Sequence, residues 1–409
     1  MTKKHSDVYV YNPTADLAIL NGTTSYMPPA RLVRFENDLS FLPAFISNEH
    51  DIILSNESPS NEFKEVLEEV HVGHQEFIAL NEINNIHKLH LNMIRPWSWS
   101  PTMHYRMREI KLLCSETFLN SPNASWKKEH THFFSRNTSL QLSSELKNMI
   151  YSSENITIPL LPQIIRNIDE LSEIASKLKN NYVIKTPWSS SGRGIQFVAP
   201  KTLGKLNVNW IKGSIKQQGY ILVEPNLNKI ADISFHFLIE PNGAVRFLGH
   251  AFFINDHKGH FIGSYIEEYP VNILQLIDMN WLSNSVNEAK TYLEEAIAKL
   301  KIHENYVGPV GIDGIIFTTD NGKLKLHPSL EINLRYTMGY YTLKFRQKLH
   351  PESKGQWYIK QSKNNEWSSF STTHKKINPI TKKEGYILNG FIPVSDEKAI
   401  FGCWLEISH

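Results

Sequence analysis

The stretch from Tyr182 to Val198, YVIKTPWSSSGRGIQFV, decides how the rest of the chain is interpreted. YVIK alternates aromatic or β-branched residues with others, which is typical of a strand, and Pro187 prevents that strand from running on. The small residues SSSGRG follow, and their backbone N–H groups can approach an anion closely. With Lys185 at its mouth and Arg193 within it, the loop is a candidate phosphate-binding loop, although it lacks the Walker A pattern. The alternative is an ordinary β-hairpin with a flexible tip.

A second group of polar residues lies on two strands expected further along the chain. The stretch VGIDGIIF carries Asp313, and the later KLHPSLEINLR carries Glu331, Asn333 and Arg335. Alternate residues of a strand point to one face, so the last three side chains line up, and a hairpin can place Asp313 beside them. Asp, Glu and Asn form an all-oxygen set suited to Mg²⁺. Together with the loop, they predict a nucleoside triphosphate site in two halves. The alternative is a solvated strand face with a Glu331–Arg335 ion pair.

The composition restricts the class of protein. The chain has 409 residues, 41% of them apolar, and a net charge of +2 from 43 basic and 41 acidic residues. Such a balance gives no general attraction for nucleic acid or a membrane surface. No apolar run reaches the roughly 20 residues of a membrane span. Two cysteines, Cys114 and Cys403, cannot build a disulfide framework. We therefore expect a soluble cytoplasmic protein of roughly two to four domains.

Strands and helices alternate in the first part of the chain. We expect strands over residues 7–11, 51–54 and 76–80, with helices over residues 31–46 and 63–70 between them. This order predicts a small, parallel, Rossmann-like α/β layer. The polar run NPTAD follows the first strand, where a ligand cleft would open, but a polar connecting turn explains it equally well.

Later elements are expected on either side of the loop. Two nearby tryptophans, Trp97 and Trp99, are expected to pack a joint between domains. Helices are expected over residues 133–150, 168–178 and 280–301, and strands over residues 182–185, 220–224, 233–240, 244–250, 310–318 and 323–333. The last 60 or so residues are expected to form a small β appendage.

Taken in order, these motifs resemble the ATP-grasp superfamily, in particular its carboxylate–amine ligases. VIKTPWSSSGRG is similar to the strand lysine and mobile glycine-rich loop of that family. YILVEPN is similar to its linking strand, which ends in a glutamate, here Glu224, and GIDGII with EINLR is similar to its two metal-binding strands. FFSRNTS offers Arg136 where the family more often has a phosphate-binding lysine, and YTMGYY replaces a glycine-rich segment. The resemblance covers residues 133–341.

The resemblance implies an α/β (α+β) fold with two α+β subdomains that grip a nucleotide. The implied division is a Rossmann-like α/β domain over residues 1–130, a first subdomain with the loop over 131–220, a second subdomain with the metal site over 221–345, and the appendage over 346–409. It also implies ATP and Mg²⁺ as cofactors, with two ions expected and Mn²⁺ as an alternative metal.

The resemblance further assigns roles to particular residues. Asp313, Glu331 and Asn333 would hold the metal, and Arg335, Arg193 and Lys185 would act in catalysis. The nucleotide would be bound by Arg136, Lys185, Ser189, Ser190, Ser191, Gly192, Val223, Glu224 and Asp232. The reaction implied is ATP-dependent amide-bond formation between a small-molecule carboxylate and an amine, through an acyl phosphate, with release of ADP and phosphate.

Two other functions remain open from the sequence. The first is a kinase on the same fold, with His327 as a candidate base for a substrate hydroxyl. The second is a nucleotide-binding protein without catalysis. The oligomeric state also remains open, with a homodimer as the first candidate. The sequence does not identify the carboxylate or the amine.

Overall fold

The N-terminal part of the chain forms a parallel four-stranded sheet with the order β3-β2-β1-β4. The structure is a computed structural model that describes residues 5–83, 90–177, 181–189, 194–199, 204–256, 259–363 and 366–409. All four residues of β2 are buried, as expected for a parallel strand covered on both faces. The strands are β1 Ser6–Val10, β2 Ile52–Ser55, β3 Glu76–Ala79 and β4 Leu91–Pro96.

Short helices connect and follow these strands. Ser60 caps α3, because its side chain accepts a hydrogen bond from the backbone N–H of Phe63 at 3.1 Å. The helices are α1 Ala15–Asn21, α2 Ala30–Asp38, α3 Asn61–Glu69, α4 Pro101–Arg106, α5 Glu116–Leu119 and α6 His130–Phe133, with 3₁₀ turns at Leu42–Phe45, Ile110–Leu113 and Pro122–Ala124.

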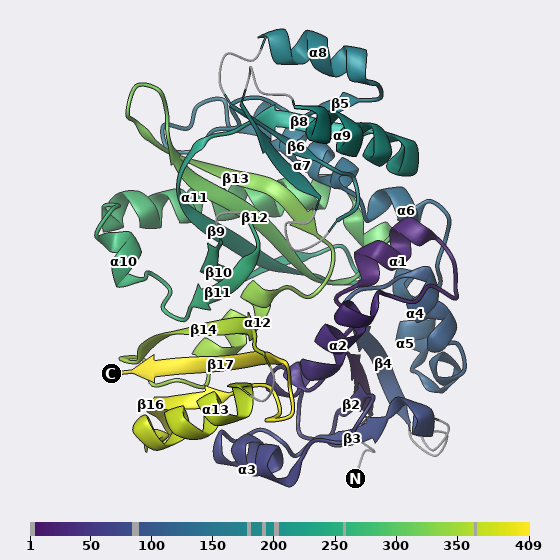
Figure 1. Ribbon diagram of the computed structural model, residues 1–409, viewed down its shortest axis with the longest axis vertical. Coiled ribbons are helices and arrows are strands. Elements are labelled where there is room, and N and C mark those ends of the chain that lie inside the picture. The colour runs from purple at the N-terminus through teal and green to yellow at the C-terminus, as the bar shows by residue number, and fades with distance from the viewer. Residues whose placement is uncertain are drawn as a thin grey trace.

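A small antiparallel sheet holds the predicted loop and lies at the top of Figure 1. Its strands, in sheet order, are β5 Gln163–Ile165, β8 Ile221–Pro225, β6 Tyr182–Lys185 and β7 Ile195–Val198. The helices α8 Ile168–Lys177 and α9 Lys205–Gln218 cover it, and Leu171 and Ile211 pack against Tyr182 and Ile184. The predicted strand–loop–strand hairpin is therefore confirmed: β6 and β7 pair from Tyr182–Val198 to Lys185–Ile195.

The central sheet has nine strands among the described residues, in the order β13-β12-β9-β10-β11-β14-β17-β16-β15. The long helices α7 Arg136–Met149 and α11 Met279–Lys299 pack against it and against each other. Its strands are β9 Asn228–Ile239, β10 Val245–Asn255, β11 Phe261–Tyr265, β12 Gly308–Thr318, β13 Leu324–Asn333, β14 Lys354–Gln361, β15 Thr381–Lys383, β16 Tyr386–Pro393 and β17 Phe401–Ser408. Smaller elements are α10 Val271–Leu274, the 3₁₀ turn Ile302–Glu304, α12 Met338–Arg346 and α13 Glu366–Ile377.

The C-terminal strands continue the central sheet, since β14 pairs with β11 and with β17. They also cover the second face of the N-terminal sheet (Figure 1), where Tyr9 and Phe41 share one core with Phe345, Trp357 and Leu405. The sequence did not predict this role of the tail, nor the helices α1, α12 and α13 or the strand β4. The domain limits stay a prediction.

Trp97 and Trp99 are both buried, as predicted for a joint between domains. Trp97 contacts Tyr11 edge-on at 5.1 Å between ring centroids and stacks on Tyr341 of α12 at 5.8 Å. It therefore packs the N-terminal sheet against the C-terminal half of the chain.

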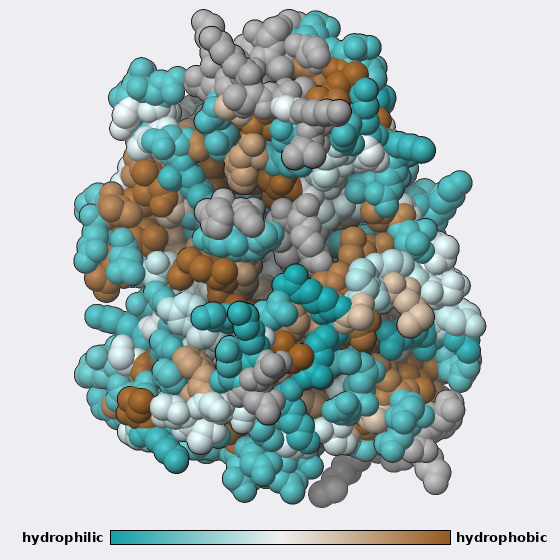
Figure 2. Space-filling view, viewed as in Figure 1, coloured by the Kyte–Doolittle hydropathy of each residue, from teal (hydrophilic) through white to brown (hydrophobic). Residues whose placement is uncertain are grey.

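The surface carries both hydrophilic and apolar regions. In the view of Figure 2, apolar side chains gather over α10 and the start of α11, where Val271, Leu276 and Met279 are exposed. Among the described helices, none is both long and apolar enough to cross a bilayer.

Candidate active site

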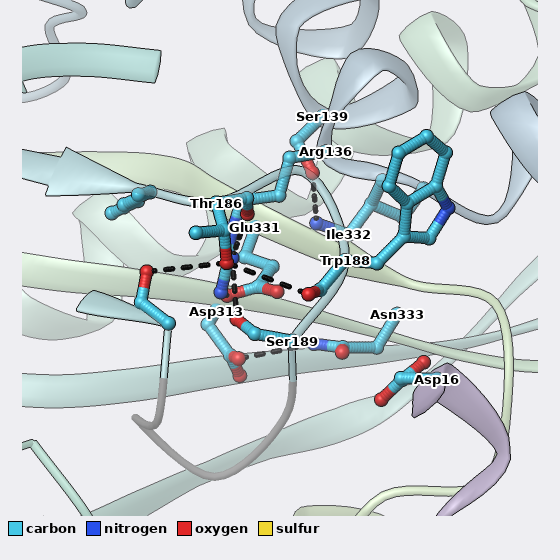
Figure 3. A network of polar contacts seen from close by, with 12 residues as sticks. Asp16, Arg136, Ser139, Thr186, Trp188, Ser189, Asp313, Glu331, Ile332 and Asn333 are labelled. Atoms are coloured by element: carbon cyan, nitrogen blue, oxygen red, sulfur yellow. Dashed lines mark hydrogen bonds and ion pairs between the residues drawn. The ribbon is translucent and has the colours of Figure 1, made fainter. Parts of the chain in front are cut away.

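Arg136 joins the two predicted halves of the site. It is the first residue of α7, and its Nη1 donates to the carbonyl oxygen of Thr186 and, at 2.7 Å, to Oγ of Ser189. Its Nη2 contacts Oε2 of Glu331 at 3.0 Å (Figure 3). The end of the strand that carries Lys185 and the acidic hairpin thus face each other across one guanidinium group.

The guanidinium of Arg136 is almost completely buried. Its side chain is only 6% exposed, and its buried Nε has no hydrogen-bond partner among the residues that the structure describes. A buried N–H group normally has a partner, so an acceptor for this atom is expected.

The base of the loop requires glycine at position 194. The backbone N–H of Thr186 donates to the carbonyl oxygen of Gly194 at 2.9 Å. A Cβ atom at Gly194 would overlap the side chains of Thr186 and Ser189, so only glycine fits this close crossing. The next predicted ligands, Ser190, Ser191, Gly192 and Arg193, lie outside the described residues.

Lys185 forms a buried ion pair with Glu224 on the neighbouring strand β8. Its positive charge also reaches His327 of β13. Burial, together with the charge of Lys185, lowers the pKa of His327 to about 3. Lys185 therefore lies near β13 of the central sheet and is already paired with Glu224. Its role as a phosphate ligand stays a prediction.

Asp313 and Glu331 are directly opposite each other on β12 and β13. The side-chain amide of Asn333 donates to Oδ2 of Asp313 at 3.1 Å. Burial, and then the charge of Glu331, raise the pKa of Asp313 to about 7, although Arg335 and the Asn333 hydrogen bond lower it. Two neighbouring carboxylates that are both partly exposed fit a divalent cation, which would supply further positive charge.

This set fits Mg²⁺ better than a metal bound by protein groups alone. Within the described ranges, no group of three or more His, Cys, Asp or Glu side chains could hold a metal ion. Two carboxylates and an amide leave positions for water and phosphate oxygens, which Mg²⁺ usually retains. Whether these residues bind metal stays a prediction.

Arg335 takes a different partner from the one considered in the sequence. Its Nη2 lies 3.5 Å from Oδ2 of Asp16, and its guanidinium lies over the ring of Trp97, 6.0 Å from the centroid. Glu331 pairs with Arg136 instead, so the alternative of a Glu331–Arg335 ion pair is wrong. Arg335 also lies beyond the end of β13, since the strand stops at Asn333.

Two predicted nucleotide ligands already have partners in the sheets. Val223 lies within β8 and pairs with Gln163 on one side and Ile184 on the other, so its peptide groups face neighbouring strands. This arrangement does not favour the predicted backbone hydrogen bonds to adenine. Asp232 accepts hydrogen bonds from Lys229 at 2.6 Å and Asn255 at 3.3 Å, and burial raises its pKa.

Comparisons with known proteins identify the fold. Neither protein-family models nor curated protein sequences match the chain. Several solved structures, however, match the chain over nearly its whole length. N5-carboxyaminoimidazole synthetase from Staphylococcus aureus, complexed with ADP, is similar at a TM-score of 0.52 and 11% identity over 100% of this chain and 95% of its own. The biotin carboxylase–β,γ-ATP complex from Campylobacter jejuni has a TM-score of 0.52 and 12% identity over 99% of this chain and 88% of its own. An ADP complex of N5-carboxyaminoimidazole ribonucleotide synthetase has a TM-score of 0.51 and 9% identity over 100% of this chain and 94% of its own.

The chain has the ATP-grasp fold. The predicted fold class is therefore confirmed: a parallel α/β layer precedes two α+β units, and the hairpins that carry Lys185 and Glu331 belong to those two units.

Within this ATP-grasp fold, the N-terminal layer contributes to the cleft as well. Asp16 at the start of α1 and Ser98 after β4 line the same cleft as Arg136, Glu331 and Arg335. Neither Asp16 nor Ser98 was among the site residues predicted from the sequence. The sequence did contain one indication for Asp16, because the polar run NPTAD follows the first strand. It contained none for Ser98, which lies between two tryptophans. The remaining lining residues are Phe133, Phe134, Ser135, Pro187, Trp188, Ser189, Ile332, Asn333 and Leu334.

Proposed function

We propose that the protein is an ATP-dependent carboxylate–amine ligase acting on small molecules. The observation that carries this proposal is the pair of carboxylates, Asp313 and Glu331, held against the strand end of Lys185 by Arg136. Glu331, Arg136 and Arg335 line one cleft, and Asp313 lies opposite Glu331 on the neighbouring strand. Acidic groups for a cation beside basic groups for phosphates are what transfer of a phosphoryl group requires.

The proposed reaction has two steps. A carboxylate oxygen of the first substrate attacks the γ-phosphorus of ATP, the bond to the β-phosphate oxygen breaks, and ADP leaves with the electron pair. The nitrogen of the amine then attacks the acyl carbon, the bond from that carbon to the phosphate oxygen breaks, and phosphate leaves. The amine loses a proton as the amide forms.

The chain's residues would serve these steps in separate ways. Lys185 and Arg136 bind and orient phosphate groups, and Arg335 stabilises charge on the acyl oxygen and the phosphate. Asp313, Glu331 and Asn333 would hold Mg²⁺ or Mn²⁺, and a second ion belongs to the same proposal. The metal would supply positive charge to the β- and γ-phosphates.

The remaining predicted ligands complete the nucleotide site of this proposal. Glu224 would leave Lys185 to contact ribose, and Asp232 would lie on the adenine side, whereas the strand pairing of Val223 does not favour its predicted role. The sequence-predicted loop ligands Ser189, Ser190, Ser191, Gly192 and Arg193, most of which lie outside the described residues, would bind the phosphates and keep water from the acyl phosphate.

Trapping with hydroxylamine tests the proposal, because only an acyl phosphate gives a hydroxamate. The protein is incubated with ATP, Mg²⁺, hydroxylamine and a panel of amino acids and small acids, and hydroxamate and ADP are measured. We expect both products with at least one acid. Glu331→Gln should abolish them, whereas Asp320→Asn, an exposed carboxylate at the far end of the same hairpin, should not.

Other results would redirect the assignment. Wild-type rates in Glu331→Gln would refute the metal site. ADP release with phosphorylation of a hydroxyl and no hydroxamate would favour a kinase, and ATP binding without ADP release would favour a non-catalytic protein. The structure gives the kinase no good base at His327, because its pKa of about 3 makes it a weak proton acceptor.

A further inference from the structure

A second cavity, of about 170 Å³, lies beside the cleft. We call it the side cavity. One wall is the edge strand β4 with the segment that follows it, together with α5. The other is formed by the turn between β9 and β10 and by the segment leading into β12. Its most prominent lining residues are Arg95, Trp97, Trp99, Phe118, Tyr306 and Tyr336.

The side cavity meets the cleft at the residues around Arg335. Ser98 lines both spaces. Trp97 lines the side cavity and carries the Arg335 guanidinium over its ring at 6.0 Å. Tyr336 also lines it, and its backbone N–H donates to the carbonyl oxygen of Trp97 at 3.0 Å. A molecule whose reacting group lies at Arg335 therefore has the side cavity next to it.

The charged groups of this wall are already neutralised. Arg95 and Glu240 are the charged residues that line the side cavity. Arg95 forms an ion pair with Asp7, and Glu240 lies 3.6 Å from Arg246. The wall therefore offers no uncompensated charge to a ligand.

Polar groups of the wall are engaged in the same way. The Asn123 amide donates to the carbonyl oxygen of Val307 at 2.6 Å and accepts from its N–H at 3.2 Å. The Tyr306 hydroxyl donates to the carbonyl oxygen of Pro309 at 2.7 Å. What remains is mainly aromatic and aliphatic surface, which favours an uncharged apolar group.

The size of the side cavity specifies that group further. A dry apolar cavity of about 150 Å³ accommodates benzene. The side cavity is open to solvent on one side, where Thr117 is exposed, so a ligand of this size can enter it. A pocket of this size and apolar lining, next to the cleft, fits a ring of benzene's size.

We propose that one of the two substrates carries an uncharged ring, aromatic or aliphatic and of six-membered size, that binds in the side cavity. The inference rests on the proposed ligase function. Either the carboxylate or the amine can carry the ring, and the chemistry of recognition is the same for both.

Paired substrates distinguish the two sources. The carboxylate arm compares phenylacetate with acetate, with hydroxylamine as the acceptor. The amine arm compares benzylamine with methylamine, using an acid that the hydroxamate assay has identified. We expect kcat/KM to be about tenfold or more higher for the ring compound in one arm, as burial of a ring predicts.

Variants that fill the side cavity test whether a preference for ring substrates arises there. Leu238→Trp fills it from the β9 side, and Thr117→Trp fills it from the opposite, exposed wall in case the first variant folds poorly. Either variant should reduce the ratio of kcat/KM for ring and ring-free substrates about tenfold. Leu112→Trp, at a position that is 77% exposed and does not line the cavity, should leave the ratio unchanged.

The outcomes separate this inference from the proposed function. Hydroxamate formation with the same ratio in wild type and in the filled variants would overturn the ring, while the ligase function stands. No ADP release with any acid would overturn the function, and the ring substrate with it. Saturation-transfer NMR with benzylamine and phenylacetate, without ATP, gives an independent result: binding that Leu238→Trp or Thr117→Trp abolishes supports the inference, and no binding overturns it.

Discussion

Replacing Asp313 with asparagine should make the metal-free protein more stable at alkaline pH. The folded pKa of Asp313 rises from 3.8 to about 7. Each unit of pKa corresponds to about 1.36 kcal/mol, so ionising this group in the folded protein costs on the order of 4 kcal/mol. Relaxation and water entry reduce such costs, and we expect the substitution to stabilise by about 2 kcal/mol. Asparagine can still accept the hydrogen bond from Asn333.

The sign of the pH dependence follows from linkage. Between about pH 4 and pH 7 the unfolded chain loses the proton of Asp313 while the folded protein keeps it, so this group lowers stability as pH rises through that range. The penalty is absent below the unfolded pKa of 3.8, still small near pH 4.5 and nearly complete by pH 8. Asp313→Asn should therefore resemble the wild type near pH 4.5 and exceed it in stability near pH 8.

Urea unfolding in EDTA, followed by tryptophan fluorescence at both pH values, measures this difference. Asp320→Asn serves as the control, because that carboxylate is exposed. The same stability difference between wild type and Asp313→Asn at pH 4.5 and pH 8 would refute the reasoning. The substitution should also abolish the effect of Mg²⁺ on nucleotide binding, which titration calorimetry can detect.

Three further substitutions test the loop, the cleft and the tail. Gly194→Ala should weaken ATP binding about tenfold or more, because its Cβ would overlap Thr186; unchanged affinity in calorimetry would contradict the close crossing. Asp16→Asn should lower kcat about tenfold with little change in KM for ATP, because Arg335 loses its ionic partner; a change confined to KM would argue against this positioning role. Asp38→Ala should destabilise by about 2–4 kcal/mol, since its Oδ2 accepts from the backbone N–H groups of Ile400 and Phe401 at 2.8 and 2.9 Å. Thermal unfolding checks this, and an unchanged midpoint would count against the tail contact.

The helices and strands predicted correctly are those whose formation depends on residues close together in the sequence. The alternation in YVIK identified β6, and a polar residue before an apolar helical pattern identified α3 and α7. The sequence also predicted that the loop strand and the acidic hairpin approach each other, and Arg136 contacts both the carbonyl oxygen of Thr186 and Glu331. The chemical roles of Lys185 and Glu331 stay predictions.

The missed elements depend on contacts distant in sequence. β4, LNMIRP, is an edge strand of mixed composition that pairs with β1 alone. The aromatic segment after Arg335 suggests a strand, yet Thr337 caps a helix there, with its Oγ1 accepting from the N–H of Tyr340 at 3.4 Å. The ion-pair partners were missed for the same reason, since nothing local to Arg335 or Asp16 indicates that they meet.

Each described cation of the proposed phosphate site is paired with a carboxylate: Lys185 with Glu224, Arg136 with Glu331 and Arg335 with Asp16. A triphosphate must therefore take these cations from their partners. Glu331, once released by Arg136, is free to bind a metal, so phosphate and Mg²⁺ exchange partners with the protein together and each should promote the binding of the other.

Glu331→Gln separates the two parts of this exchange. In this variant Arg136 loses its carboxylate partner, and the site loses one negative charge. ATP in the presence of EDTA should therefore bind about tenfold more tightly to the variant than to the wild type. The gain from added Mg²⁺ should at the same time be lost. Calorimetry with and without Mg²⁺ measures both effects, with Asp320→Asn as the control. Weaker binding of metal-free ATP to Glu331→Gln would mean that Arg136 does not exchange Glu331 for phosphate, and the coupling argued here would be wrong.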